Sequence, residues 1–413
     1  MLETAFAFGA TAVYAGQPRY SLRVRNNDFG DIAVLQQGID RAHALGHKFF
    51  LVSNIFPHDN KIKSYLQNMA PVVALKPDAM IMSDPGLIMM VRETWPEMEI
   101  HLSVQANTVN SAAVRFWKSV GVRRVILSRE LSLDQVAQIR QQCPDTELEV
   151  FVHGALCIAY SGRCLLSGYF NHRDANQGSC TNSCRWDYKV KPATEDASGD
   201  VYVIEESQRA GSFMPIEEDE HGTYVMNSKD LRAIEHVKRL VEIGVDSLKI
   251  EGRTKSPYYV ARTVQSYAQA IADAVAGRAL DPALLGQLEG LANRGYTSGF
   301  FQRHTPQETQ NYLRGYSESG RSLYVGDVLS FDAARSLAEV NVKNRFAVGD
   351  WLEIIQPGGN HNVQLTRMEN VEAQPMMVAP GSGHIVWLPL PASAVGAFVA
   401  RYVAEFEPAN AGA

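Results

Sequence analysis

The chain has 413 residues, which is enough for two or three domains of ordinary size. Hydrophobic residues make up 46% of it and charged residues 20%, a balance that excludes a disordered or low-complexity chain. The formal net charge of −6 argues against a protein that binds nucleic acid over its whole surface. Local basic groups remain, either as interaction patches or as solvated faces: Arg19, Arg23 and Arg25; Arg123 and Arg124; Lys249, Arg253 and Lys255.

The sequence contains no run of about 18 consecutive apolar residues, so it predicts no transmembrane helix and no membrane partner. Its first residues lack a basic segment followed by a long apolar core, which argues against a secretory signal. We therefore expect a cytoplasmic protein. In that reducing compartment, clustered cysteines bind metal or serve catalysis more often than they form disulfides.

Short, nearly continuous apolar runs recur through the first 255 residues, and each ends in polar residues or glycine. Strands that are buried on both faces of a parallel sheet have this pattern. The runs are TAVYAG (11–16), KFFLVSN (48–54), DAMIMSD (78–84), EIHLSVQ (99–105), RVILSRE (124–130), LEVFVHG (148–154) and SLKIEGR (247–253).

Segments with helical spacing of apolar residues lie between these runs, as in 31–46 and 229–243. Alternating strands and helices indicate βα units and a parallel sheet. Seven strands are visible and eight would close a barrel, so we predict a TIM-type (β/α) barrel whose first strand is missing. An open doubly wound sheet is the alternative, weakened because no glycine-rich phosphate fingerprint follows any strand.

Polar side chains gather at the ends of the predicted strands, where such barrels carry their chemistry. We expect at least four of them to face a ligand, and the others to cap helices or close the barrel mouth. The strand-end residues are Tyr14, Asn54, Asp84, Gln105, Arg129, Glu130, His153, Glu251 and Arg253.

The pattern changes after a last predicted helix at 282–293. A polar, aromatic-bearing connector (296–321) follows the barrel domain (1–295). Short alternating runs then follow, separated by turn residues such as Gly358-Gly359, and they predict a small C-terminal antiparallel β-barrel over 322–410.

Four of the five cysteines lie in one long loop (155–190) after the sixth visible strand: Cys157, Cys164, Cys180 and Cys184. Loops of this length in compact domains are usually functional. Four thiolates suit an iron–sulfur cluster or a zinc ion. Only the last two cysteines have the close spacing that structural zinc prefers, so a cluster is favoured, with zinc and then structural or redox thiols as alternatives. Cys143 stands apart and is expected to be a small buried hydrophobe.

At this loop the sequence resembles a known family. The stretches EVFVHGALC (149–157) and SGRCLLS (161–167) are similar to the signature of the collagenase-like peptidase family of unassigned catalytic type. Over nearly its whole length, the sequence resembles one bacterial subgroup of this family, the prephenate-dependent tRNA uridine hydroxylases. The similar segments are 14–29, 81–93, 101–110, 124–133, 226–234 and 247–256.

The resemblance implies a TIM-type core, oxygen-independent hydroxylation and a 4Fe-4S cluster on Cys157, Cys164, Cys180 and Cys184. It implies that the wobble uridine in the tRNA anticodon loop becomes 5-hydroxyuridine, with prephenate as co-substrate. The family usually opens with a strand of the type Glu-Leu-Leu-Ser-Pro-Ala-Gly, and this sequence begins after it, which puts barrel closure in question.

If the resemblance holds, the two carboxylates of prephenate need cations, and Arg129 and Arg253 are the candidates. Lys249 is less suitable because strand alternation could turn it away. Each arginine could instead pair with Glu130 or Glu251.

The remaining candidates would serve uracil recognition and proton transfer. Uracil needs aromatic stacking and hydrogen bonds, and His153 could transfer protons near neutral pH. The expected catalytic residues are His153, Arg129, Arg253, Glu251 and Gln105, and the expected substrate- or cofactor-binding residues are Tyr14, Asn54, Asp84 and Tyr160.

Four thiolates leave no open iron, so an electron-transfer or structural role is expected, with a possible electron-transfer partner. Two other functions stay open. The first is a peptidase, but this sequence does not contain the His-Glu-x-x-His motif that would support a metalloprotease. A non-enzymatic metal-binding adaptor would dock its partner through the C-terminal barrel, but would not need the polar strand ends.

Overall fold

The computed structural model describes residues 1–16, 19–22, 29–156, 230–252, 255–291, 295–302 and 322–402 in full. Between 157 and 229 it describes only the backbone of five short strands: β7 (Tyr188–Pro192), β8 (Tyr202–Glu206), β9 (Phe213–Pro215), β10 (Glu218–Asp219) and β11 (Gly222–Thr223). Cys157, Cys164, Cys180, Cys184, Tyr160 and Arg253 therefore lie outside the described residues.

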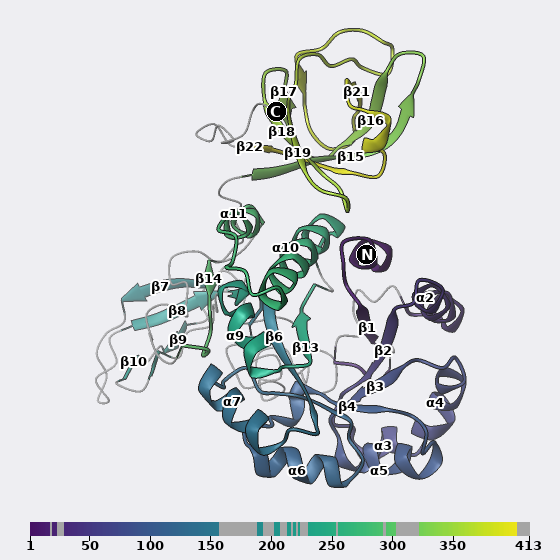
Figure 1. Cartoon of the computed structure of the whole chain (residues 1–413), viewed down its shortest axis with the longest axis vertical. Helices are drawn as coiled ribbons and strands as arrows, with labels where there is room; N and C mark the ends of the chain where they lie inside the picture. Colours follow the sequence, from purple (N-terminus) through teal and green to yellow (C-terminus); the bar gives the residue numbers. More distant parts are fainter. Residues whose placement is uncertain are drawn as a thin grey trace.

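A parallel sheet organises the first part of the chain (Figure 1). Its first six strands pair in chain order, and β13 pairs in parallel with β6. The bounds are β1 (Ala12–Gly16), β2 (Lys48–Ser53), β3 (Ala79–Met82), β4 (Ile100–Leu102), β5 (Arg124–Ile126), β6 (Glu147–Ala155) and β13 (Ser247–Ile250). These are the seven predicted strands, and most of their side chains are buried because helices cover the outer face.

Helices separate most of these strands, and side-chain caps set where several of them begin. Asp84 and Asn110 accept a hydrogen bond from the first turn of α5 and α6, and Ser132 forms a capping box with Gln135 on α7. The helices are α1 (Leu2–Ala7), α2 (Ile32–Ala44), α3 (Asp59–Ile62), α4 (Tyr65–Val73), α5 (Pro85–Thr94), α6 (Ser111–Ser119), α7 (Leu133–Gln142), α9 (Val237–Ile243), α10 (Pro257–Val275) and α11 (Ala283–Glu289).

The segment 229–243 is not one helix, which corrects the expectation from its apolar spacing. Its first residues form β12 (Asp230–Arg232), which pairs antiparallel with the end of β6 and in parallel with β14 (Tyr296–Thr297). The 3-10 turn η4 (Ile234–His236) follows, and α9 begins only at its end. Backbone pairing with β6 outweighs the local helical pattern here.

The two outer strands of the parallel sheet, β13 and β1, meet through a side chain. The pairings of the described strands do not join β13 to β1. The Tyr14 hydroxyl of β1 instead lies 3.3 Å from the Ile250 carbonyl oxygen and 3.1 Å from Glu251 Oε2. The fold is thus mixed α/β with a parallel sheet, and closure into a complete barrel stays a prediction.

The C-terminal region is a separate antiparallel β structure with its own core, which confirms an antiparallel β region there. Its main sheet has the order β19-β18-β22-β15-β16-β21. The strands are β15 (Ser322–Asp332), β16 (Leu337–Val342), β17 (Phe346–Ala347), β18 (Trp351–Ile355), β19 (His361–Gln364), β20 (Val378–Ala379), β21 (Ile385–Leu388) and β22 (Phe398–Tyr402), with the 3-10 turn η5 (Ala392–Ala394).

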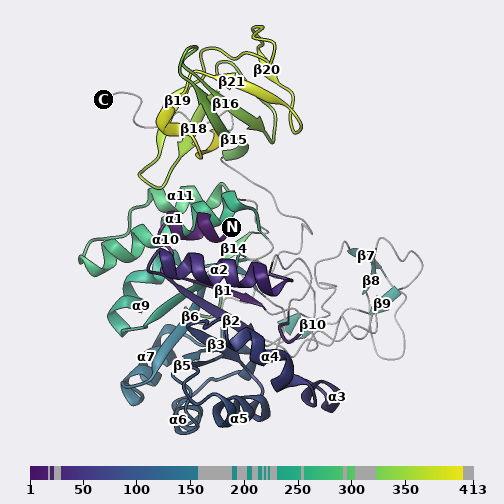
Figure 2. The same ribbon diagram turned by 90° about the vertical axis from the view of Figure 1, so that its right-hand side faces the viewer.

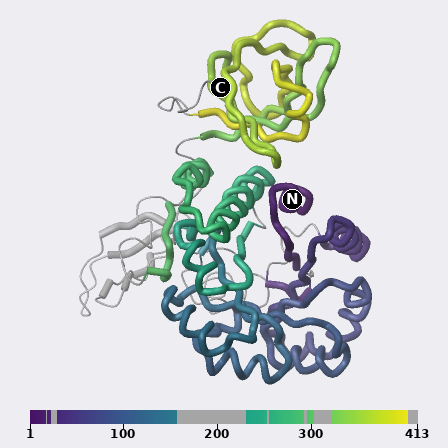
Figure 3. The backbone as a smooth tube through the Cα atoms, in the orientation of Figure 1, coloured from purple at the N-terminus to yellow at the C-terminus, as the bar shows by residue number. Residues whose placement is uncertain are grey.

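Helix α10 joins the two parts, and the C-terminal β structure lies over it and over α1 (Figures 1 and 3). Arg262 of α10 pairs with both carboxylate oxygens of Glu353 on β18, at 2.8 Å for Nη1–Oε1. Both side chains are buried. Beside this pair the rings of Tyr258 and Tyr324 stack at 4.6 Å. Across the part of the chain that the structure describes, no helix is long and apolar enough to cross a membrane.

The Arg262–Glu353 pair generates a stability prediction. Replacing Arg262 with Ala leaves the Glu353 carboxylate buried without its cation, so we expect the free energy of unfolding to fall by about 3–5 kcal/mol. Denaturant unfolding measures this. The matched control is the double variant Arg262→Met/Glu353→Leu, which removes both charges and should recover most of the loss. An Arg262→Ala protein as stable as the wild type would contradict the assignment.

Candidate functional site

A chain of buried charges lies on the inner face of the parallel sheet. Glu149 of β6 accepts hydrogen bonds from Lys249 of β13 at 2.7 Å and from Arg124 of β5 at 3.2 Å. Glu149 is 2% exposed and Lys249 is 7% exposed. Burial acts to raise the pKa of Glu149, but the Lys249 charge and hydrogen bonds outweigh it and lower this pKa to about 2. Glu149 is therefore ionised throughout the physiological pH range.

Aromatic rings continue this chain toward the carboxyl ends of the strands. The Lys249 ammonium lies 3.9 Å from the centroid of the Tyr14 ring and 5.8 Å from that of Phe151. The Arg129 guanidinium lies 4.0 Å from the centroid of the same Phe151 ring. Such geometry stabilises cations on ring faces. With Glu251, which accepts a hydrogen bond from Tyr14, these residues form what we call the rim cluster.

The rim cluster thus unites three of the sequence-predicted residues, Tyr14, Arg129 and Glu251, with Lys249 and Phe151. The expectation that Lys249 turns away was wrong. Lys249 pairs in register with Phe151, and neighbours in a sheet share a face. Lys249 and Glu251 are two residues apart, and side chains two apart in a strand lie on the same face of the sheet. This spacing in the sequence could have predicted that Lys249 lies on the same side as Glu251.

Gln105 lies on the 3-10 turn η1 (Val104–Ala106), just after β4. It is 3% exposed, and its Oε1 atom has no hydrogen-bond partner among the described residues. A buried carbonyl oxygen left without a donor costs about 1–3 kcal/mol. The Gln105 amide oxygen can therefore accept a hydrogen bond from a ligand, for example from an N–H group of a base.

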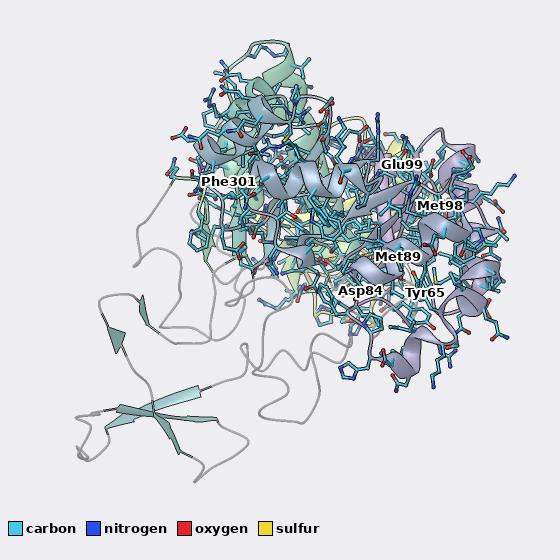
Figure 4. All side chains as sticks on the ribbon, turned by 90° about the horizontal axis from the view of Figure 1, so that it is seen from below. Tyr65, Asp84, Met89, Met98, Glu99 and Phe301 are labelled. Carbon is cyan, nitrogen blue, oxygen red and sulfur yellow. The ribbon has the colours of Figure 1, made fainter. Side chains whose placement is uncertain are left out.

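Asn54 and Asp84 are engaged within the protein. Asn54 accepts a hydrogen bond from the Leu22 N–H group and donates one to Ser103 Oγ, both at 3.1 Å. Asp84 accepts one from the Leu87 N–H group at 2.8 Å and caps α5. Figure 4 labels Asp84 beside Tyr65, near α4. The hydrogen bonds of Asn54 and Asp84 fit the expectation that some strand-end residues cap helices or close the barrel mouth. Ligand roles for Asn54 and Asp84 stay predictions.

His153 does not join the rim cluster, because β6 contains a bulge. The register against β13 slips by one residue between Phe151 and His153, so His153 lies beside Ile250 instead of facing the side that carries Lys249. A bulge re-aims the side chain that follows it. The His153 ring instead packs 5.4 Å from the ring of Tyr267 on α10.

The environment of His153 fixes its protonation. Tyr267 donates its hydroxyl proton to the Val152 carbonyl oxygen at 2.7 Å, so it accepts from His153 Nδ1 at 3.3 Å. His153 Nε2 is buried and has no hydrogen-bond partner in the described part of the chain. Burial lowers the pKa of His153 to about 3. A pKa this low makes the ring a weak base near neutral pH, which argues against the proton transfer expected there.

Gly154 allows the end of β6 to lie against Glu251. Its φ of +111° favours glycine, and a Cβ atom there would lie 2.5 Å from the Glu251 carbonyl oxygen. The next residue, Ala155, ends β6. The described end of β6 therefore lies beside Glu251 of the rim cluster, and Cys157 follows two residues later in the sequence.

The donor set of that loop suits an iron–sulfur cluster, because four thiolates are its usual ligands. Among the residues that the structure describes, no group of three or more His, Cys, Asp or Glu side chains could hold a metal. Cys143 is buried after α7, and its thiol donates to the Ser111 carbonyl oxygen at 3.6 Å, as expected for a packed cysteine.

Two family models match this sequence: "Peptidase family U32" over residues 1–311 and "Peptidase family U32 C-terminal domain" over residues 321–401. The chain belongs to peptidase family U32. This confirms the family resemblance that the motifs around Cys157 predicted.

Several relatives of this chain carry names that refer to RNA. The chain is 58% identical to "tRNA hydroxylation protein P" of Escherichia coli, over 94% of this chain and 91% of the relative. It is 54% identical to the protein of that name from Haemophilus influenzae, with the same coverage. It is 30% identical to "23S rRNA 5-hydroxycytidine C2501 synthase" of Escherichia coli, over 85% of this chain and 50% of the relative.

The pKa of Glu149 generates a prediction on pH and stability. Its folded pKa, about 2, lies below the ordinary value of 4.5, so its ionised form stabilises the fold above pH 4.5. This contribution, about 3 kcal/mol, is lost as the pH falls from 4.5 to 2. Glu149→Gln should lower the free energy of unfolding at pH 7 and flatten its decline in acid.

Denaturant unfolding between pH 7 and pH 3 measures both effects. The control is Glu93→Gln on α5, where the side chain is exposed. It should follow the wild type across the range. Equal acid sensitivity of the wild type and Glu149→Gln would contradict the ionised, paired state of Glu149.

Proposed function

We propose that this chain hydroxylates the wobble uridine of tRNA at C5, in an oxygen-independent, prephenate-dependent reaction that uses a 4Fe-4S cluster. The observation that carries the proposal is the 58% identity, over nearly the whole chain, to a protein named for tRNA hydroxylation. The rRNA relative is named for a 5-hydroxylated pyrimidine, which supports the C5 position of a pyrimidine ring as the target.

The rim cluster supports the prephenate part of the proposal. Prephenate is a dianion with a ring, so it needs cations and an apolar surface. Arg129 lies on the Phe151 ring and Lys249 lies on the Tyr14 ring, which offers both chemistries from neighbouring strands. Arginine binds a carboxylate through two parallel hydrogen bonds, and Arg253 would supply a second such group.

Uracil recognition and proton removal would fall to other residues of the same site. Gln105, with its unpaired amide oxygen, would accept a hydrogen bond from uracil N3–H. Tyr14 or Tyr160 would stack on the base. Replacing the C5 hydrogen with a hydroxyl group at the oxidation level of hydroxide releases one proton and two electrons. The Glu251 carboxylate is the described base in the rim cluster that would take the proton, and the redox partner would be the oxidant that takes the electrons. His153, neutral and turned away, would position the end of β6.

Cys157, Cys164, Cys180 and Cys184 would hold the cluster, next to the carboxyl end of β6. When bound, a 4Fe-4S cluster with four thiolate ligands supplies electron transfer, in exchange with a redox partner. The protein's own residues would bind prephenate, orient the uracil and accept the proton.

The experiment is mass spectrometry of tRNA nucleosides from a strain lacking the gene, complemented with variants. We expect 5-hydroxyuridine and its derivatives to disappear and to return with the wild-type gene. Cys180→Ser/Cys184→Ser should fail to restore them and should lose iron and acid-labile sulfide. Cys143→Ser is the matched control, because this packed thiol lies outside the cluster loop, and it should restore them fully.

Normal levels of these nucleosides in the deletion strain, with no redundant enzyme present, would contradict the proposed function. Full complementation by the Cys180→Ser/Cys184→Ser variant would contradict the cluster assignment alone.

A further inference from the structure

The connection between β2 and α4 is long and lies at the same end of the sheet as the rim cluster. Connections from strand to helix in α/β units usually have about 2–6 residues, whereas this one covers residues 54–64. It contains α3, a single turn in which no residue is buried. Figure 2 shows α3 standing out from the sheet and its covering helices. Ile55 and Ile62 anchor the segment to the core, but the polar side chains of α3 take no part in that packing.

The start of the segment is held firmly. Asn54 bonds to both Leu22 and Ser103, and its carbonyl oxygen accepts from Ser83 Oγ at 3.2 Å. The connections that follow β1, β2, β3 and β4 are thus tied together at their base. Helix α3 projects from a fixed support next to the candidate site.

Lys61 and Lys63 leave uncompensated positive charge on this projection. Neither side chain has an ion pair or hydrogen bond with any described residue, and the single acidic residue of the segment is Asp59. Several other cations of the described surface pair with carboxylates, as in Arg41–Glu3, whereas Arg115 and Lys238 stand unpaired on two separate helices. In a chain of net charge −6, two unpaired lysines this close together form a local exception.

Arg19 extends the positive surface along α4. Its Nη1 atom donates to Asn68 Oδ1 at 3.1 Å, and the Asn68 N–H group bonds to the Ser64 carbonyl oxygen one turn earlier. The guanidinium therefore lies against the first turn of α4, which directly follows the α3 segment. His58, exposed at the N-cap of α3, adds a further donor. Arg19, His58, Lys61 and Lys63 together form the α3 patch.

We propose that the α3 patch binds the phosphate backbone of the RNA substrate beside the site at the strand ends. This rests on the proposed function. Unpaired lysines on flexible stems act as point charges for phosphates, and such contacts set the register of the nucleic acid without reading its sequence. The patch binds the strand next to the target base, while the rim cluster receives the base. An acidic protein partner would be the other use of such a surface.

Binding of a tRNA transcript to the complete, cluster-loaded chain tests this, by fluorescence anisotropy between about 50 and about 200 mM salt. Lys61→Glu/Lys63→Glu should weaken binding at least ~10-fold and lower the slope of log affinity against log salt by about 2. Lys61 is half-buried and Lys63 is exposed, and neither belongs to the core that Ile55 and Ile62 of the same segment contact, so thermal unfolding should match the wild type.

The matched control is Arg115→Glu/Lys238→Glu. These cations are also exposed and have no ion pair or hydrogen bond with a described side chain. They lie on α6 and α9, and the charge change is identical. The control should change affinity less than about twofold. Equal effects of the two double variants, or no effect of either, would overturn the α3 patch as an RNA-binding surface. A wild-type chain that binds no tRNA would contradict the patch and the proposed function together.

Discussion

The buried ion pair between Lys249 and Glu149 is the interaction on which the rest of the site depends. Taking two charges out of water is costly unless they are paired and fully hydrogen-bonded. Arg124 supplies a second cation to Glu149, and the rings of Tyr14 and Phe151 lie next to the Lys249 ammonium. One ion pair thus brings the Lys249 ammonium into contact with both rings. Tyr14 in turn holds Glu251 at the carboxyl end of β13.

Side chains of strand β6 lie in two different environments along its length. Up to Phe151 it follows the register of the sheet and lines the inner face, and the bulge then turns His153 toward α10. Gly154 lets the strand pass close to Glu251 before the cysteine loop begins. Helix α10 packs against His153 on one side and holds the C-terminal β structure through Arg262 on the other. One helix thus connects the end of β6 to the second core.

The sequence predicted the parallel strands because strands covered on both faces consist of continuous apolar runs. The sequence also predicted that Tyr14, Arg129 and Glu251 lie close together, because parallel strands end at the same edge of a sheet. It missed β12, whose three residues form a strand through pairing with β6 and β14. It misplaced His153 because a bulge shifts the alternation without leaving a clear local pattern. Contacts such as Arg262–Glu353 join residues 91 positions apart, and residue spacing carries no signal for them.

The most direct measurement is complementation of the deletion strain with a Glu251→Gln variant, read by mass spectrometry of tRNA nucleosides. This change keeps an acceptor for Tyr14 but removes the carboxylate proposed as the base. If the rim cluster is the reaction site, 5-hydroxyuridine derivatives should fall at least ~10-fold, with protein level and iron content unchanged. Wild-type nucleoside levels from Glu251→Gln would contradict the assignment of the reaction to the rim cluster.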